Sequence, residues 1–299
     1  MFTKNVGIVA RLFSTKEEDV PRRVELAQQL LEAATSVRLQ NQKGSFKRID
    51  LVVWADPKYE SDCGMTAAAL RKMVQARGYK DVYVSGEVHA DLFCGLLNRA
   101  TARQSRGGCD YVMFLSPEAS SYLTQSNMDL MWGALAAGAK VTGLAISEIT
   151  DSILEGRIGN SCAIWEIESL LAVGGFDLEA KKPTLDEERY HAFVRGAGKD
   201  GHDRFYHLAG VEEMIPLARL VKEYGACIAP ILPTDESQVY IVPDRETQPE
   251  LWQRHWNKIA TKDERQVRHL ARECVETTYL KDAGGMPAYR HPRVYGKRG

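Results

Sequence analysis

Short apolar runs alternate with segments of helical spacing over the first half of the chain. Unbroken apolar runs predict buried strands over 6–10, 49–54, 82–84, 111–115 and 141–146. Between them, apolar residues three and four apart predict helices over 21–34, 67–74, 90–103 and 128–137. This alternation indicates an α/β fold whose central sheet is mostly parallel and flanked by helices on both faces. Ligands of such sheets bind at the carboxyl ends of the strands.

The second half has a less regular pattern. Residues 174–177 read as a turn, and the polar segment 181–210 is long enough for a loop that closes over a site. Helical spacing returns over 212–223, followed by the apolar run 226–229. The remaining residues show two helical stretches and a basic tail. We therefore predict one α/β domain over 1–240 and a C-terminal helical extension over 241–299.

Composition and charge narrow the class of protein. Hydrophobic residues make up 44% of the chain, which excludes a disordered protein. The 39 Lys and Arg nearly cancel the 40 Asp and Glu, which argues against nucleic acid as a partner but leaves room for a local phosphate site. Six scattered cysteines without a CxxC pair predict reduced thiols and a cytoplasmic location. No apolar stretch reaches about 18 residues, so no membrane span is predicted.

Several familiar nucleotide and hydrolase motifs are missing from the sequence. The first predicted strand is not followed by GxGxxG, the fingerprint of dinucleotide-binding folds. Neither the phosphate-binding GxxxxGK[ST] loop nor the GxSxG nucleophile motif occurs. The chemistry therefore has to come from other features.

Three features carry chemically suitable groups. The strand 111–115 runs into Ser116-Pro117-Glu118, and a carboxylate at that place can hold a divalent cation that neutralises a diphosphate. The predicted helix 212–223 begins with Glu212-Glu213. Acids there are favoured by the helix dipole alone, and they also suit a general base for a sugar hydroxyl. The third feature is the turn Gly-Gly-Phe-Asp over 174–177.

In this order and spacing, the three features resemble the family 2 glycosyltransferases of the GT-A fold, over about residues 5–235. That family carries a DxD-type motif after a strand, a GGFD turn and an acidic pair at the head of an apolar helix containing Arg. Here Ser116-Pro117-Glu118 resembles the Asn-Pro-Asp variant, and 174–177 matches GGFD letter for letter. The helix containing Arg219 fits the acidic-pair helix.

The resemblance implies an inverting transfer of a sugar from a nucleotide-diphosphate donor to an acceptor hydroxyl. Glu213, or Glu212, would be the catalytic base, and Glu118 would hold a divalent cation, Mn or Mg. The residues assigned to binding of the nucleotide-sugar donor are Arg11, Asp56, Asn98, Ser116 and Asp177. The acceptor would be a glycan, a lipid-linked molecule or a small molecule.

Departures from the family pattern keep two alternatives open. Ser116 and Glu118 replace the two Asp of DxD, and a single carboxylate predicts a weak cation site or none. This change also fits a non-catalytic protein that binds a nucleotide-sugar or a glycan on the same scaffold. A nucleotidyltransferase is the other alternative, although the stretch after the first strand lacks the glycines typical of that class.

The C-terminal region suggests contacts beyond the catalytic domain. Trp252 and Trp256 lie four residues apart at helical spacing, which favours packing on the domain or on a second copy of the chain. Five Lys and Arg against one Asp over 279–299 form a basic tail. Together they also suit a peripheral membrane contact.

Overall fold

The computed structural model describes residues 4–13, 17–39, 46–55, 60–88, 92–144, 158, 160–178, 211–225, 228–231, 234, 245–247 and 249. The predicted donor ligand Asp56, the 181–210 loop and the C-terminal stretch 250–299, with Trp252 and Trp256, lie outside these residues. Among the described residues, none of the helices combines the length and the apolar character needed to cross a membrane.

A seven-stranded sheet forms the centre of the molecule, with strand order β3-β2-β1-β4-β6-β5-β7. The strands are β1 (Val6–Phe13), β2 (Arg48–Ala55), β3 (Val82–Val88), β4 (Tyr111–Leu115), β5 (Val141–Leu144), β6 (Cys162–Glu166) and β7 (Ile228–Ile231). Strand β6 runs antiparallel to both of its neighbours, and every other pairing is parallel. The predicted α/β class with a mostly parallel sheet is confirmed.

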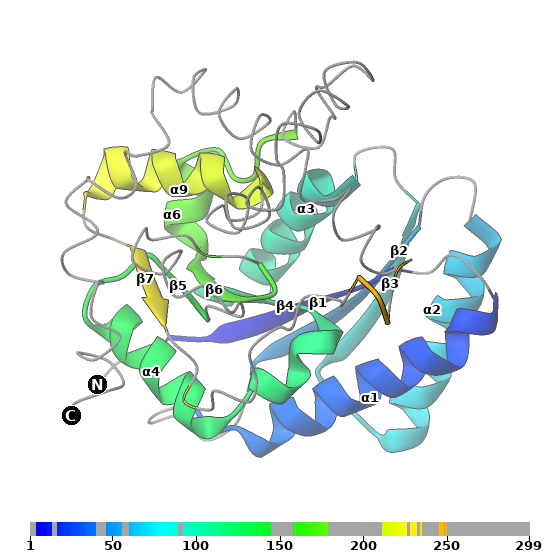
Figure 1. Ribbon diagram of the computed structural model, residues 1–299. Coiled ribbons are helices and arrows are strands. Elements are labelled where there is room, and N and C mark those ends of the chain that lie inside the picture. Colours follow the sequence, from blue (N-terminus) through cyan, green and yellow to red (C-terminus); the bar gives the residue numbers. More distant parts are fainter. Residues whose placement is uncertain are drawn as a thin grey trace, which may run out of the picture.

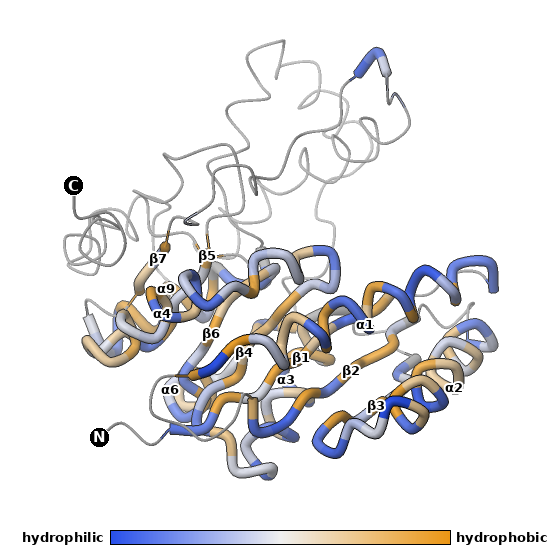
Figure 2. Tube along the Cα trace, turned by 90° about the horizontal axis from the view of Figure 1, so that it is seen from below, coloured by the Kyte–Doolittle hydropathy of each residue, from blue (hydrophilic) through white to orange (hydrophobic). Residues whose placement is uncertain are grey.

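Helices cover both faces of the sheet. The α-helices are α1 (Val20–Ser36), α2 (Glu60–Arg77), α3 (Leu92–Arg106), α4 (Gln125–Ala136), α6 (Ile167–Ala172) and α9 (Val211–Tyr224), and the short 3-10 helices are η1 (Glu17–Asp19) and η3 (Pro117–Tyr122). Helices α3, α6 and α9 lie on one face, and α1, α2 and α4 lie on the other (Figure 1). Figure 2 shows hydrophobic strands between helices whose outer sides are hydrophilic. Two covered faces explain why the strands read as continuous apolar runs.

Strand β6 is the element that the sequence pattern does not predict. Its apolar run of four residues is followed by Glu166 and passes directly into α6 without a turn residue, so periodicity cannot separate strand from helix. In the sheet, Cys162 pairs with Leu115 and Glu166 pairs with Tyr111. Because the two strands are antiparallel, the start of β6 lies at the carboxyl end of β4. The residues just before β6 therefore join the edge where a ligand is expected.

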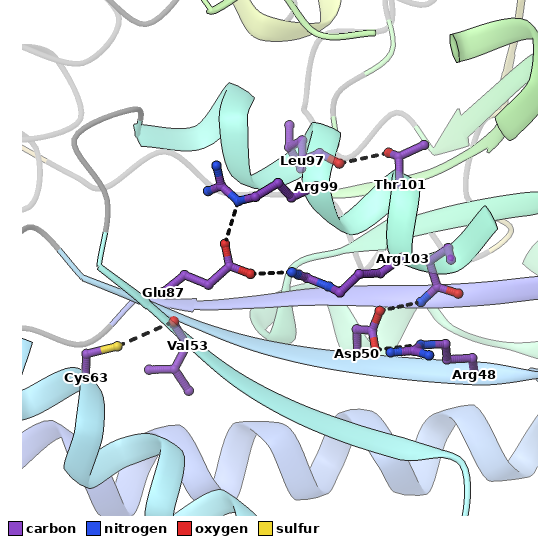
Figure 3. Close-up of polar contacts among 10 residues, drawn as sticks. Arg48, Asp50, Val53, Cys63, Glu87, Leu97, Arg99, Thr101 and Arg103 are labelled. Carbon is purple, nitrogen blue, oxygen red and sulfur yellow. Dashed lines mark hydrogen bonds and ion pairs between the residues drawn. The ribbon is translucent and has the colours of Figure 1, made fainter. Parts of the chain in front are cut away.

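Half-buried ion pairs and a buried hydrogen bond fix α3 on the sheet (Figure 3). Glu87 of β3 accepts from Arg99 Nε at 3.0 Å and from Arg103 Nη1 at 2.6 Å. Asp50 of β2 accepts from Arg48 Nε at 2.8 Å and from a glutamine of α3 at 3.1 Å. These bonds fix the carboxyl half of α3, so its amino end is held above the carboxyl ends of the strands.

That glutamine, Gln104, is part of a tightly packed core contact. A Cβ at Gly7 of β1 would overlap the Gln104 amide, so glycine is required there. The amide nitrogen also donates to the carbonyl of Ile8 at 3.0 Å, and the amide oxygen accepts from Cys109 Sγ at 3.2 Å. Residue 7 thus faces α3, and alternation along β1 places Arg11 on the same face.

Four of the six cysteines lie within the described residues, and all four are buried and outside any disulfide: Cys63, Cys94, Cys109 and Cys162. The prediction of reduced core thiols is confirmed for these four. Cys227 and Cys274 lie outside the described residues.

Candidate functional site

The carboxyl ends of β1 and β4 bring the first two predicted site residues to one edge. Ala10 pairs with Leu115, so Arg11 and Ser116 are the next residues of two neighbouring strands. The backbone N–H of Ser116 donates to the carbonyl of Ser161 at 2.8 Å, which ties the end of β4 to the start of β6. Both predicted residues are half-buried at this edge.

Cys94 marks the point where four predicted site residues come together. The thiol lies near the amino end of α3 and is only 1% exposed. Its pKa is raised first by burial and then by the negative charges of three carboxylates, and one guanidinium lowers it. Those charged groups are Glu212, Glu213, Asp177 and Arg11. Charged residues from β1, the 174–177 turn and α9 therefore all lie within electrostatic range of one buried side chain.

The GGFD turn has a conformation that explains its glycines. Gly174 and Gly175 have φ of 87° and 70°, values that side chains with a Cβ rarely adopt. Their N–H groups donate to the carbonyls of Leu171 and Leu170, which ends α6. The chain then reverses and places Asp177 half-buried at the surface.

Phe176 anchors this turn in the core. Its ring packs edge-to-face on Phe114 of β4 and Trp165 of β6, with ring centroids 5.5 and 5.4 Å apart. Such aromatic pairs contribute about 0.5–1.5 kcal/mol beyond the area they bury. The aromatic residue of the GGFD turn is thus a packing residue, and it holds the neighbouring aspartate in place.

Asn98 lies against the same turn. Its Nδ2 donates to the Phe176 carbonyl at 2.8 Å, and its Oδ1 accepts from the Phe176 N–H at 2.8 Å. A Cβ at Gly175 would lie 2.5 Å from that Oδ1, so the amide can approach only a glycine. The sequence predicts Asn98 as a donor-binding residue, whereas in the structure its amide pairs with the backbone of the turn.

The two acids of the pair in α9 have different surroundings. Glu213 is 3% exposed, and its Oε1 accepts the backbone N–H of Asn160 at 2.7 Å. Asn160 in turn accepts from the indole N–H of Trp165 at 2.9 Å. Glu212 is half-buried in the first turn of the helix. The buried acid therefore holds the segment that leads into β6, while its neighbour retains access to solvent.

Glu118 lies on the other side of the sheet. It belongs to η3, which packs on α1, and its side chain is 55% exposed. One carboxylate oxygen is 3.1 Å from Arg23 Nη1 of α1. Among the described residues, no three His, Cys, Asp or Glu side chains are grouped to hold a metal ion. In this structure Glu118 is thus paired with a cation of α1, and its role as a metal ligand stays a prediction.

Sequence reasoning missed two contacts that build the site. Asn160 gives no signal in the sequence, because its role depends on an unpredicted strand. In the sequence Arg219 is only part of the helix pattern, yet its Nη1 donates to the Val173 carbonyl at 3.2 Å, next to the GGFD turn. Cys94 reads as an ordinary core thiol from sequence alone, and only the fold places charged groups around it.

Comparisons with known proteins give a distant likeness in structure. No family model matches the chain, and no curated protein matches its sequence. Among solved structures, the mannosyltransferase PcManGT from Pyrobaculum calidifontis, in complex with GDP-Man and Mn²⁺, aligns with a TM-score of 0.40 and 10% identity. The alignment covers 91% of this chain and 76% of that chain.

Proposed function

We propose that this protein is a glycosyltransferase. It transfers a sugar, with inversion, from a nucleotide-diphosphate donor to the hydroxyl of an acceptor. The observation that supports the proposal is the set of charges acting on Cys94: Asp177 of the GGFD turn, the acidic pair of α9 and Arg11 of β1 all lie within electrostatic range of that thiol. Sequence motifs more than thirty residues apart thereby share one site.

The chemistry of these groups suits the transfer. Arg11 supplies positive charge at the edge where the donor binds, and Ser116 adds a polar group beside it. Asp177 provides a carboxylate for sugar hydroxyls, and Asn98 keeps its backbone in place. An acid of the α9 pair takes the proton of the attacking hydroxyl. Asp56, which follows β2, completes the proposed nucleotide contacts.

A divalent cation, Mn or Mg, is the cofactor that the motif resemblance implies. Its charge would compensate that of the leaving diphosphate. Glu118 is the carboxylate of the Ser-Pro-Glu motif, but its pairing with Arg23 does not suit it to that task. No step of the proposed mechanism therefore depends on the cation.

A second candidate function is non-catalytic binding of a nucleotide-sugar. The observation that favours it is the altered Ser-Pro-Glu motif, because Ser116 has no carboxylate and Glu118 is engaged by a cation of α1. Such a protein would bind the donor without releasing nucleoside diphosphate. Turnover thus separates the two candidates.

The test combines binding and turnover on the full chain. UDP-, GDP- and dTDP-sugars are titrated by calorimetry, and nucleoside diphosphate release is followed with each, with Mn²⁺ and with a chelator. We expect one donor to bind and to be turned over, and Asp177→Asn to weaken donor binding at least tenfold. Asp81→Asn, an exposed acid before β3, is the matched control and leaves both unchanged. Binding without release in every condition would favour the second candidate, and no binding would reject both.

A further inference from the structure

The two acids that begin α9 have different roles, and we infer that Glu212 is the general base whereas Glu213 is a positioning residue. This assignment rests on the proposed glycosyl transfer. It is drawn from the burial, partners and helical placement of the two side chains.

Glu213 is poorly placed to meet an acceptor. Its side chain is 3% exposed, and its Oε1 already accepts the N–H of Asn160 at 2.7 Å. A general base has to come within hydrogen-bond distance of the hydroxyl whose proton it takes. Glu213 instead accepts from a backbone N–H that would otherwise be buried without an acceptor, and this is a structural role.

The segment that Glu213 holds is part of the site. Asn160 and Ser161 immediately precede β6, and the carbonyl of Ser161 accepts the N–H of Ser116 at the end of β4. The side chain of Asn160 also accepts from Trp165, and the Trp165 ring packs on Phe176 of the GGFD turn. Through these contacts, Glu213 sets the position of the carboxyl edge of the sheet without contacting substrate itself.

Helix geometry directs Glu212 to a different side. Successive helical residues are about 100° apart around the axis, so the two acids cannot share one direction. Residues seven apart lie almost two turns along and share a face, which pairs Glu212 with Arg219. Arg219 Nη1 reaches the Val173 carbonyl beside the GGFD turn at 3.2 Å. Glu212 therefore lies on the face of α9 that meets the turn carrying Asp177.

Glu212 is half-buried in the first turn of a 14-residue helix, a position at which the helix dipole favours acidic side chains. In the transfer, the acceptor oxygen forms a bond to the anomeric carbon as the bond from that carbon to the diphosphate oxygen breaks. The hydroxyl proton passes to the Glu212 carboxylate, and the nucleoside diphosphate leaves with the bonding electron pair.

Four proteins test the assignment: wild type, Glu212→Gln, Glu213→Gln and the matched control Glu223→Gln, an exposed acid in the last turn of α9. Nucleoside diphosphate release is measured with the donor that wild type turns over, with water as acceptor, and melting temperature is measured alongside. We expect Glu212→Gln to lower kcat by about 10²–10⁴-fold with little change in KM or melting temperature. Glutamine at 213 keeps an oxygen for the Asn160 N–H, so Glu213→Gln stays within tenfold of wild type.

Two further variants complete the design. Formate added to Glu212→Ala is expected to restore part of the rate, because it supplies the missing carboxylate. Glu213→Leu removes the acceptor for Asn160 and is expected to lower the melting temperature. The assignment would be overturned, without affecting the proposed function, by a loss of kcat above a hundredfold in Glu213→Gln at unchanged melting temperature. A wild-type kcat in Glu212→Gln would overturn it as well. No release by wild type from any donor would instead overturn the proposed function, and the assignment with it.

Discussion

Single side chains give the site its shape, and the amide of Asn98 is the clearest case. It makes both hydrogen bonds to the backbone of Phe176, in the manner of a neighbouring strand. This arrangement needs a glycine at 175, both for the positive φ and for the approach of the amide. The Gly-Gly-Phe part of the GGFD sequence is thus explained by packing of the turn.

Gly175→Ala is expected to destabilise the protein. The left-handed backbone costs a residue with a Cβ roughly 1–2 kcal/mol, and the clash with Asn98 Oδ1 adds to that cost. Urea unfolding measures the difference. Gly64→Ala in α2 is the matched control, because its Cβ meets nothing within 4 Å, and alanine should stabilise the helix there by about 0.5–1 kcal/mol. Equal stability of wild type and Gly175→Ala would contradict this explanation of the turn.

Glu118→Gln tests the ion pair at the end of β4. The carboxylate is more than half exposed, so losing Arg23 as partner should lower the free energy of unfolding by less than about 1 kcal/mol. Arg23→Gln should have an effect of the same size, and the double variant should be less than additive. A rise in the melting temperature of wild type with Mn²⁺ that disappears in Glu118→Gln would instead identify Glu118 as a metal ligand.

At the scale of elements, α3 links the core to the site. Its carboxyl half is fixed by Glu87 and Asp50 of two strands (Figure 3). Near its amino end lies Cys94, on which the acids of the site act electrostatically. Because a helix is rigid, fixing one end of α3 also fixes the position of its other end relative to the strand ends. The ion pairs distant from the site are therefore part of what positions it.

Asp50 should make stability depend on pH. Burial raises its pKa above the ordinary 3.8, and this effect outweighs the lowering by Arg48. A carboxyl group whose pKa is higher in the folded than in the unfolded state binds its proton more tightly when the protein is folded. It therefore stabilises the fold at pH values below its unfolded-state pKa, and this stabilisation is lost as the pH rises through its folded-state pKa. The free energy of unfolding of the wild type should therefore fall as the pH rises above about 4, and Asp50→Asn should reduce this fall.

Urea unfolding at a series of pH values measures that slope. Asp81→Asn, at an exposed position before β3, is the control and should keep the slope of wild type. A slope in Asp50→Asn that equals that of wild type would show that Asp50 does not govern the pH dependence.

The pattern of apolar residues predicts most elements, because covered strands and amphipathic helices leave distinct periods in the sequence. Strand β4 is predicted with its observed bounds, while α2 begins at Glu60, well before the apolar spacing starts. Strand β6 is missed, since a five-residue strand fused to a helix has no period of its own. The Asn160 contact is missed for the same reason, because it depends on long-range pairing.

At the scale of the whole molecule, the net charge of the chain is near zero, although acidic residues are concentrated locally at the candidate site. Asp177, the Glu212-Glu213 pair and Arg11 come from three separate parts of the chain, and all of them act electrostatically on one buried thiol. Because β6 runs antiparallel to β4, it begins at the carboxyl edge, so Asn160 and Ser161 just before it lie at that edge. The motif residues were predictable individually, whereas their meeting point required the fold.

The central claim is that this edge of the sheet transfers a sugar by a single displacement. The most direct measurement is proton NMR of the full chain with the nucleotide-sugar that binds best, recorded from the first minutes of reaction. We expect the donor to be consumed and the first product to have the anomeric configuration opposite to that of the donor. A donor that persists unchanged, or a first product that retains the configuration, would contradict it.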